Sequence, residues 1–356
     1  MEEINDIRKN IDDIDKKILD LLNQRAKWAL KIKKTTLGKT PIRPERESSI
    51  VRELAQTNPG PLPPEAVREI FTAIIASFRD SMQLEKPVKV SFLGPKGSYS
   101  EEAAVKLFGG TITVQPEETI QDVVRSVENG SANLAVVPIE NSSEGAVIET
   151  HRLLFSTDAK IVAEISLPII HCLLANTSEL ERITTVYAHP QALGQCRNWL
   201  ATHLAGAKQV PCSSNSAAAE LAAKEKSAAA VAGRKAGEIY GLKIVESGIN
   251  DQPGNETRFL ALGGLETQPT GHDKTSMIIV LNDNPGALHR VLGILANAGI
   301  NMTRLESQPY KKDQYAFYID FVGHIKDEQV AEAVKKIDQD TRICQILGSY
   351  PAEVGR

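Results

Sequence analysis

The sequence contains little that would support disulfide bonds or a metal centre. Of its 356 residues only four are cysteines, and no two of them form a CxxC pair. Their apolar or mixed surroundings are typical of free thiols in a reducing compartment. The seven histidines show no spacing characteristic of metal ligands either. We therefore expect no metal site and no bound cofactor. The four cysteines are Cys172, Cys196, Cys212 and Cys344.

The sequence also lacks an excess of positive charge and any long apolar run. Its formal net charge is −4, which argues against general binding to nucleic acid, because tracking phosphates requires an accumulated basic surface. No apolar run approaches the roughly 18 residues that cross a membrane. The acidic segment 1–6 lacks the positive start and apolar core of a signal peptide. These absences predict a cytoplasmic protein with neither a membrane nor a nucleic-acid partner.

The content of hydrophobic residues is sufficient for several hydrophobic cores. Hydrophobic residues make up 42% of the chain. At roughly 150 residues per domain, its length predicts two or three domains. The pattern changes after the linker 85–87 and again across the polar segment 266–273. We expect a multidomain protein with units over residues 1–86, 88–267 and 274–356.

The first unit has the periodicity of helices. Apolar residues recur every three or four positions over residues 4–36, which predicts one long amphipathic helix. Pro44 and the pair 63–64 should each open a further helix, because proline fits the first helical turn. The third helix should continue to about Leu84. Helices of such unequal length cannot bury the long first one, so we expect two chains to interlock through it.

Two arginines on the long helix are candidates for binding an anion. Arg8 and Arg25 lie 17 positions apart, which corresponds to about 25 Å along a helix. They can clamp one small dianion only if Arg8 reaches in from a dimer partner. Otherwise both are solvated surface groups.

This three-helix pattern resembles the all-helical chorismate mutase family, which works as an interlocked dimer. The resemblance rests on Arg8, Arg25 and the segment Pro44-Glu45-Arg46-Glu47. It implies that Arg8 and Arg25 hold the two carboxylates of chorismate, with Arg8 crossing from the other subunit. It further implies that Arg46 binds the substrate and that Glu47 takes its hydroxyl group.

The match to the mutase family is incomplete at two places. The family's lysine against the ether oxygen would stand at Thr36, so Lys33, Lys34 or Lys39 would have to replace it. The family's serine and glutamine of the third helix are offset, which leaves Gln83 as the candidate substrate contact and Ser81 beside it.

The rearrangement of chorismate to prephenate needs no nucleophile. It needs a compact substrate conformer and stabilisation of charge at the ether oxygen. Arginine is suited to binding this substrate, because its planar guanidinium group can donate two hydrogen bonds to one carboxylate. A missing lysine would slow the reaction more than it weakens binding.

In the middle unit strands alternate with helices, and polar clusters repeatedly follow apolar runs. The clusters are 94–98, 140–145, 188–195 and 212–216. A glycine-rich turn such as 94–98 offers backbone N–H groups to an anion. Each cluster alone is explained by helix capping or a turn, but together they indicate one cleft for a small polyanion.

The candidate site centres on the stretch 255–262, where a polar triplet precedes an apolar run that starts at Phe259. The run predicts a buried strand, and the triplet should lie at its entry. We expect Thr257 to be the central residue, since its hydroxyl can donate one hydrogen bond and accept two. The alternative is that Thr257 merely caps a strand end.

These clusters are also motifs of the prephenate dehydratase family, which the sequence resembles over residues 88–267. The resemblance implies two α/β lobes, like those of type 2 periplasmic binding proteins, with the site between them. It implies catalytic roles for Thr257, Glu140, Asn141, His189 and Gln195. One departure is Ala188, where some members have serine. We further expect prephenate to be bound by Ser98, Ser142, Ser214, Asn215 and Arg258.

Prephenate must lose CO2 and hydroxide together to form phenylpyruvate. Hydroxide is a poor leaving group and needs a hydrogen-bond donor or a proton as it departs. Thr257 is the candidate donor, although a neutral hydroxyl is a weak acid and could orient the substrate instead.

The last unit shows the order strand, helix, strand, strand, helix, strand, which is typical of a small ferredoxin-like α+β sheet. Pro285 should be the first residue of the first helix. The segments 286–288 and 306–309 resemble those that line an amino-acid site between paired ACT regulatory domains, although Gln308 replaces an arginine. The resemblance implies feedback inhibition by phenylalanine. The candidate contacts are Gly286, Ala287, Leu288, Glu306 and Ser307. The alternative is a dimerisation module without a ligand.

Three functional hypotheses follow for the whole chain. The first is a bifunctional homodimeric enzyme that converts chorismate to prephenate and prephenate to phenylpyruvate, with phenylalanine as allosteric inhibitor. The second is a monofunctional dehydratase whose mutase helices only form a dimer. The third is a two-lobed protein that senses a small anion without turnover. The intact segments 138–142 and 257–259 favour an enzyme.

Overall fold

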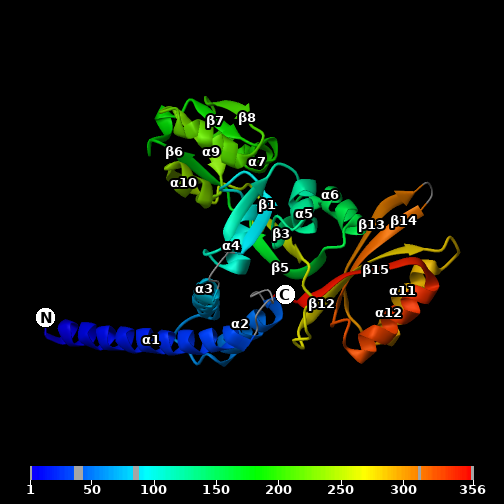
Figure 1. Cartoon of the computed structure of the whole chain (residues 1–356). Helices are drawn as coiled ribbons and strands as arrows, with labels where there is room; N and C mark the ends of the chain where they lie inside the picture. Colours follow the sequence, from blue (N-terminus) through cyan, green and yellow to red (C-terminus); the bar gives the residue numbers. More distant parts are fainter. Residues whose placement is uncertain (1, 36–42, 83–87, 312–313, 354–356) are drawn as a thin grey trace.

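The computed structural model describes residues 2–35, 43–82, 88–311 and 314–353. Four bodies are visible in Figure 1: a helical unit, two α/β lobes and a C-terminal α/β unit. The helical unit lies at the bottom, the two lobes are stacked above it, and the C-terminal unit lies to the right. The fold class expected from the sequence is therefore confirmed.

The helical unit consists of α1 (Glu2–Thr35), α2 (Pro44–Thr57) and α3 (Pro64–Met82). Its three helices are the predicted ones. In Figure 1, α1 projects away from the rest of the chain. Its apolar stripe is solvent-exposed, with exposed fractions between 48 and 62%. The stripe consists of Ile4, Ile7, Ile11, Ile14, Ile18 and Leu21.

The first lobe is built on a sheet in the order β2-β1-β3-β11-β5, with β4 paired to β3. β11 runs antiparallel to both of its neighbours, β3 and β5. Apolar side chains from both faces of this sheet form two buried clusters. Its strands are β1 (Lys89–Leu93), β2 (Thr113–Glu117), β3 (Leu134–Asn141), β4 (Gly145–Ala146), β5 (Lys160–Pro168) and β11 (Glu256–Gly263). Its helices are α4 (Tyr99–Phe108), α5 (Ile120–Glu128) and α6 (Ile148–Ser156).

The second lobe has a sheet in the order β10-β6-β9-β7-β8. The chain enters it after β5 and returns to the first lobe before β11, so two segments cross between the lobes. Its strands are β6 (Cys172–Ala175), β7 (Thr185–Ala188), β8 (Lys208–Pro211), β9 (Ala228–Ala232) and β10 (Lys243–Ser247). Its helices are α7 (Pro190–Gln195), α8 (Arg197–His203), α9 (Asn215–Ala223) and α10 (Arg234–Tyr240), with a short 3-10 turn at Leu180–Arg182.

The C-terminal unit has the predicted βαββαβ order and an antiparallel sheet β13-β14-β12-β15. Its elements are β12 (Asp273–Leu281), α11 (Ala287–Asn297), β13 (Met302–Lys311), β14 (Gln314–Val322), α12 (Glu328–Asp340) and β15 (Thr341–Pro351). The prediction that Pro285 opens the first helix is wrong. Gly286 adopts a positive φ of 78° as the N-cap, and the helix begins one residue later.

The C-terminal sheet is packed directly on the first lobe. A Cβ atom at Gly348 of β15 would lie only 2.2 Å from the carbonyl oxygen of Ile161 in β5, so glycine is required for this close approach. The helical unit contacts the same region through Arg52 of α2, whose guanidinium donates to the carbonyl oxygen of Ala352 at 3.1 Å. All three units therefore meet near the C-terminal end of β15.

Among the described residues, no helix is long and apolar enough to cross a membrane.

Candidate active site

The centre of the dehydratase candidate site is a pair of side chains on two adjacent strands. Thr257 of β11 lies opposite Asn141 of β3 in the antiparallel register. The Asn141 amide donates to the Thr257 hydroxyl oxygen at 2.8 Å. Within the described part of the chain, no protein group accepts a hydrogen bond from the Thr257 hydroxyl, so its proton can be donated to a ligand. Thr257 lies inside β11 rather than before it, because Glu256 already pairs with β5 and Thr257 pairs with both β3 and β5.

The orientation of the Asn141 amide is set by the backbone. Its oxygen accepts from the N–H groups of Ser143 and Glu144 at 3.0 and 3.1 Å. Its nitrogen must therefore be the donor, and it reaches Asn255 at 2.9 Å as well as Thr257. Ser142 closes the turn, because its hydroxyl accepts from the backbone of Glu256.

Residues of the second lobe reach the same cluster. Gln195 at the end of α7 accepts from the Asn255 amide at 3.3 Å and contacts the Nε2 atom of His171 at 2.8 Å. His171 is only 2% exposed. Burial lowers the pKa of His171, although the hydrogen bond to Gln195 opposes that effect. The sequence patterns predicted no role for His171 or for Asn255. The one signal for His171 was a histidine inside the apolar run 167–175.

Four other predicted site residues, three substrate contacts and the catalytic candidate His189, serve as caps or link two loops. Ser98 caps α4, His189 caps α7 and Ser214 caps α9 through their side chains. The Asn215 amide oxygen accepts from the backbone N–H of His189 at 3.0 Å, which holds these two loops of the second lobe together. The structure thus gathers His189, Ser214 and Asn215 in one place and gives each a structural partner.

Two N–H groups of the glycine-rich turn that the sequence suggested for anion binding already have protein acceptors. The Gly97 N–H donates to the buried Glu101 carboxylate at 2.6 Å, and the Ser98 N–H donates to the Pro95 carbonyl. The turn instead joins the two lobes. Ser216 of the second lobe donates to the carbonyl oxygen of Lys96.

Two predicted site residues point away from the Asn141–Thr257 pair. Successive side chains of a strand face opposite sides of the sheet, so Glu140 and Arg258 lie on the other face. Arg258 is 6% exposed and donates to Glu164 and Asp320 and to the Tyr350 hydroxyl. The prediction that Arg258 binds substrate is therefore corrected, because its guanidinium holds the C-terminal sheet to the first lobe.

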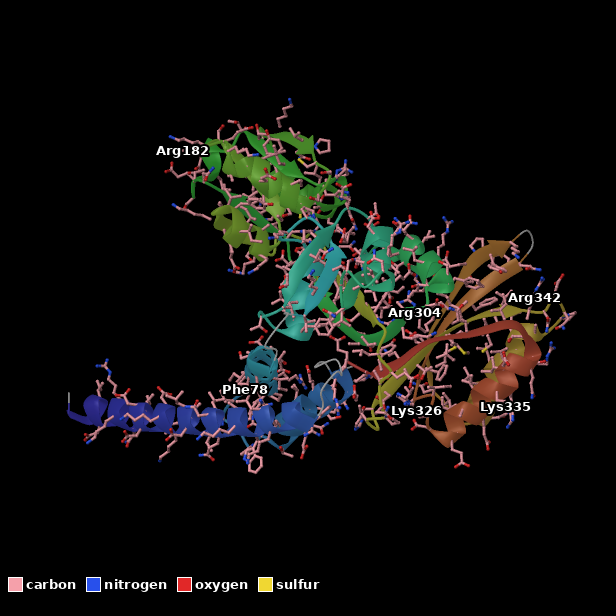
Figure 2. All side chains as sticks on the ribbon, in the orientation of Figure 1. Phe78, Arg182, Arg304, Lys326, Lys335 and Arg342 are labelled. Atoms are coloured by element: carbon pink, nitrogen blue, oxygen red, sulfur yellow. The ribbon has the colours of Figure 1, made fainter. Side chains whose placement is uncertain are left out.

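The prediction that Glu140 is catalytic is also corrected, because Glu140 lies on the same face as Arg258. Its carboxylate forms an ion pair with Arg304 of β13. Arg304 also lies over the ring of Tyr318, at 5.9 Å from the ring centroid. Figure 2 shows Arg304 between the first lobe and the C-terminal sheet.

The helical unit brings three of its five predicted site residues together, namely Arg25, Arg46 and Glu47. Arg25 of α1 lies 4.7 Å from the ring centroid of Phe78, which Figure 2 labels where α3 meets α1. Burial lowers the pKa of Arg25, Arg46 lowers it further and Glu47 opposes the effect, so all three side chains share one electrostatic environment. Arg8 is exposed near the far end of α1.

Several residues discussed for the mutase site lie outside the described parts. Gln83, Thr36 and Lys39 are among the residues that the structure does not describe. The backbones of Lys33, Lys34 and Ser81 lie in α1 and α3, but their side chains are outside the described parts as well.

The candidate amino-acid site of the C-terminal unit is divided between a helix start and a strand. Gly286 is the N-cap of α11, and Ala287 and Leu288 are the first two residues of the helix. Glu306 and Ser307 lie on β13, and Glu306 is 3.8 Å from Arg304. Arg304 is thus shared between Glu306 and the first-lobe residue Glu140.

These features define the class of protein. An all-helical unit with clustered arginines, two lobes that share a hydrogen-bonded polar cluster, and a βαββαβ unit together make a multidomain protein with two separate candidate sites for small anions. The sequence matches three families: Chorismate mutase type II over residues 7–83, Prephenate dehydratase over residues 90–266 and the ACT domain over residues 275–339. The chain belongs to the family of bifunctional chorismate mutase/prephenate dehydratases.

Full-length relatives carry both catalytic units. The bifunctional chorismate mutase/prephenate dehydratase of Pseudomonas aeruginosa is 40% identical over 363 residues, which covers 99% of each chain. Chorismate mutase and prephenate dehydratase are accordingly the activities of this chain.

Two solved structures resemble the dehydratase and ACT parts. A prephenate dehydratase from Arthrobacter aurescens in complex with L-Phe is 34% identical, with a TM-score of 0.69, and the match covers 74% of this chain and 90% of that chain. A protein described as a quorum quenching acylase, GqqA, is 32% identical, with a TM-score of 0.68, over 75% of this chain and 98% of that chain. This part of the fold therefore also occurs in a protein described by another activity.

Proposed function

We propose that the Asn141–Thr257 pair is the catalytic centre of the dehydratase, with Gln195 and His189 from the second lobe completing the site. The 2.8 Å hydrogen bond from Asn141 to Thr257 carries this proposal. It occupies the hydroxyl oxygen and leaves the hydroxyl proton for the departing group of prephenate. Ser214 and Asn215 lie on the surrounding loops and are proposed to hold the two carboxylates. The predicted contacts Ser98 and Ser142 are not assigned this role, because their hydroxyls donate to the carbonyl oxygens of Leu93 and Gly254.

The proposed chemistry has one concerted step. The bond to the departing carboxylate breaks, its electron pair moves into the ring, and the C4–O bond breaks. CO2 and hydroxide leave, and phenylpyruvate remains. Thr257 donates a hydrogen bond to the departing oxygen as negative charge develops there. We assign Thr257 the donation of a hydrogen bond and not the transfer of a proton, because the pKa of a threonine hydroxyl is far above the value that suits a general acid.

For the mutase we propose a composite site in a homodimer, with Arg25, Arg46 and Glu47 from one chain and Arg8 from its partner. The exposed stripe on α1 supports this arrangement, because a soluble helix with so much exposed apolar surface requires a partner surface to bury it.

We also place the protein in the cytoplasm, where its four free cysteines would remain reduced. The proposed units are residues 1–86, 88–267 and 274–356.

Mixed dimers test the composite mutase site. We expect Arg8→Ala and Arg25→Ala each to lower chorismate mutase kcat/KM by about 10²-fold or more, because each removes a charged hydrogen bond to a carboxylate. After the two inactive variants are unfolded and refolded together, half of the dimers are mixed and each has one intact site of two. Activity should therefore return to roughly a quarter of the wild-type value. Dehydratase activity, measured on prephenate, is the control. No recovery on mixing, with mixed dimers confirmed by mass, would contradict a site shared between chains.

We propose further that phenylalanine binds at the ACT unit, against the start of α11 and Glu306 and Ser307 of β13, and inhibits the dehydratase. The L-Phe complex of the Arthrobacter aurescens relative supports this proposal. The connection to the active site is short. Glu140 and Arg258, which pair with Arg304 and Asp320 of the ACT sheet, are sequence neighbours of Asn141 and Thr257. A ligand that favours one position of the ACT sheet would thus favour one position of the catalytic strands.

A Gly286→Trp variant tests the proposed phenylalanine site. Gly286 has a φ of 78°, and a bulky side chain there would occupy the space before α11. We expect the phenylalanine concentration for half-inhibition of the dehydratase to rise at least about tenfold while activity without phenylalanine is retained. Gly299→Trp is the matched control, because Gly299 also has a positive φ, of 62°, at the other end of the same helix. Unchanged inhibition in Gly286→Trp would refute this placement of the ligand.

A further inference from the structure

One hydrogen-bonded chain runs from the first lobe to the second through amide side chains whose orientations are mutually dependent. It begins at Asn141, whose amide oxygen is held by two backbone N–H groups. The Asn141 nitrogen donates to the oxygen of Asn255, so the Asn255 nitrogen must point away, toward Gln195. Asn255 is 7% exposed, which leaves it little freedom to exchange these partners for water.

The same hydrogen-bonded chain fixes the orientation of the Gln195 amide. Its oxygen accepts from Asn255 at 3.3 Å and from the Nε2 atom of His171 at 2.8 Å. With its oxygen occupied twice, the side chain presents its NH2 group to whatever binds next to it. Among the described residues, no protein group accepts a hydrogen bond from that NH2 group.

His171 must therefore carry a proton on Nε2. Its other ring nitrogen, Nδ1, is buried and has no hydrogen-bond partner among the described residues. Protonation of Nδ1 would bury an unpaired N–H donor and a positive charge, which is unfavourable. The ring is packed edge-on against Tyr99, with 6.3 Å between centroids. A neutral ring with its proton on Nε2 is the state that satisfies this environment.

The backbone around His171 is held independently of its side chain. Its N–H donates to the Asn250 side chain at 2.8 Å, and its carbonyl oxygen accepts from Gly248 and Ile249 at 3.0 Å each. These bonds tie together the two segments that cross between the lobes. A change of the side chain alone leaves them in place.

We propose that His171 is a positioning residue of the dehydratase, whose Nε2–H group holds Gln195 with its NH2 group directed to the substrate beside Thr257. This inference rests on the proposed site at Thr257 and Gln195. Without the histidine donor, only the longer 3.3 Å hydrogen bond from Asn255 distinguishes the two ends of the Gln195 amide. A flipped amide would present its oxygen to an anionic substrate. His171 itself does not touch the substrate.

Two substitutions at position 171 separate this role from packing. His171→Leu keeps an apolar volume but removes the donor, and we expect the dehydratase kcat/KM to fall by about 10²-fold, as a misplaced binding group commonly causes. His171→Gln places an amide nitrogen near the former Nε2 position and should remain within about fivefold of wild type. Chorismate mutase activity of the same preparations reports on intact protein. His324→Leu is the matched control, because His324 is 1% exposed and is also hydrogen-bonded through Nε2, but to Thr267 near the ACT sheet.

A double-mutant cycle with Gln195→Ala decides whether His171 acts through Gln195. If it does, the His171→Leu/Gln195→Ala protein is no slower than Gln195→Ala alone, because the residue being positioned is already absent. The proposal would be overturned if the two falls in kcat/KM multiplied in the double variant. A fully active His171→Leu protein would overturn it as well. So would a His171→Gln variant that is as slow as His171→Leu at equal thermal stability. If Gln195→Ala itself is fully active, it is the proposed site that fails, and that result is distinct from a failure of His171 alone.

Discussion

A Thr257→Val protein should convert chorismate to prephenate at the wild-type rate and form almost no phenylpyruvate. Valine has nearly the shape of threonine but cannot donate to the departing oxygen, so we expect dehydratase kcat to fall by about 10²- to 10³-fold. Stability should change little. The Asn141 amide that loses Thr257 keeps Asn255 and the carbonyl oxygen of Glu256 as acceptors.

The measurement is a pair of time courses in which chorismate or prephenate is supplied and phenylpyruvate is followed. With wild type, phenylpyruvate should form from both substrates. Thr257→Ser retains a hydroxyl at the same position and is the matched control, expected within about tenfold of wild type. A Thr257→Val protein that still forms phenylpyruvate at the wild-type rate would show that another group assists the departing hydroxide.

Arg258→Met should destabilise the contact between the first lobe and the ACT sheet by about 3–5 kcal/mol, the usual cost of removing one partner from a buried ion pair. The substitution leaves two carboxylates, Glu164 and Asp320, each 1% exposed, with less positive charge to offset them. Lys274 still pairs with Glu164 at 2.6 Å. For units of this size we expect the melting temperature to fall by about 10 °C.

Arg182→Met is the matched control for this experiment. Arg182 pairs with Glu179 at 2.7 Å, but its side chain is 68% exposed (labelled in Figure 2), so the pair is screened by water. The control should shift the free energy of unfolding by less than about 0.5 kcal/mol. Equal melting temperatures for both variants would mean that the buried pair adds nothing to the contact.

The effect of Arg258→Met should depend on pH. Burial alone would raise the pKa of Glu164, but Arg258 and Lys274 outweigh it and hold the pKa below its usual value of 4.5. A lowered carboxyl pKa contributes stability that is complete above 4.5 and is lost as the pH falls through the lower value. The difference in melting temperature between wild type and Arg258→Met should therefore be largest near neutral pH and should shrink below pH 4.5.

Much of the architecture follows from local sequence patterns. The period of the isoleucines determined α1, the prolines determined where α2 and α3 begin, and the order of apolar runs determined the βαββαβ unit. Such patterns indicate how the backbone of a segment is hydrogen-bonded and which of its faces is apolar. Both properties depend on residues that are close in sequence. Thr257 and Asn141 could also be found, because both stand in polar clusters at the ends of apolar runs.

Only the tertiary structure decided what each polar residue of these clusters does. Alternation along β3 and β11 sends Asn141 and Thr257 to one face and Glu140 and Arg258 to the other, and the ACT sheet happens to cover that second face. A sequence shows the alternation but not which domain covers which face. His171 and Asn255 likewise acquire a role only because two segments far apart in the chain cross between the lobes, where one hydrogen-bonded chain can join them.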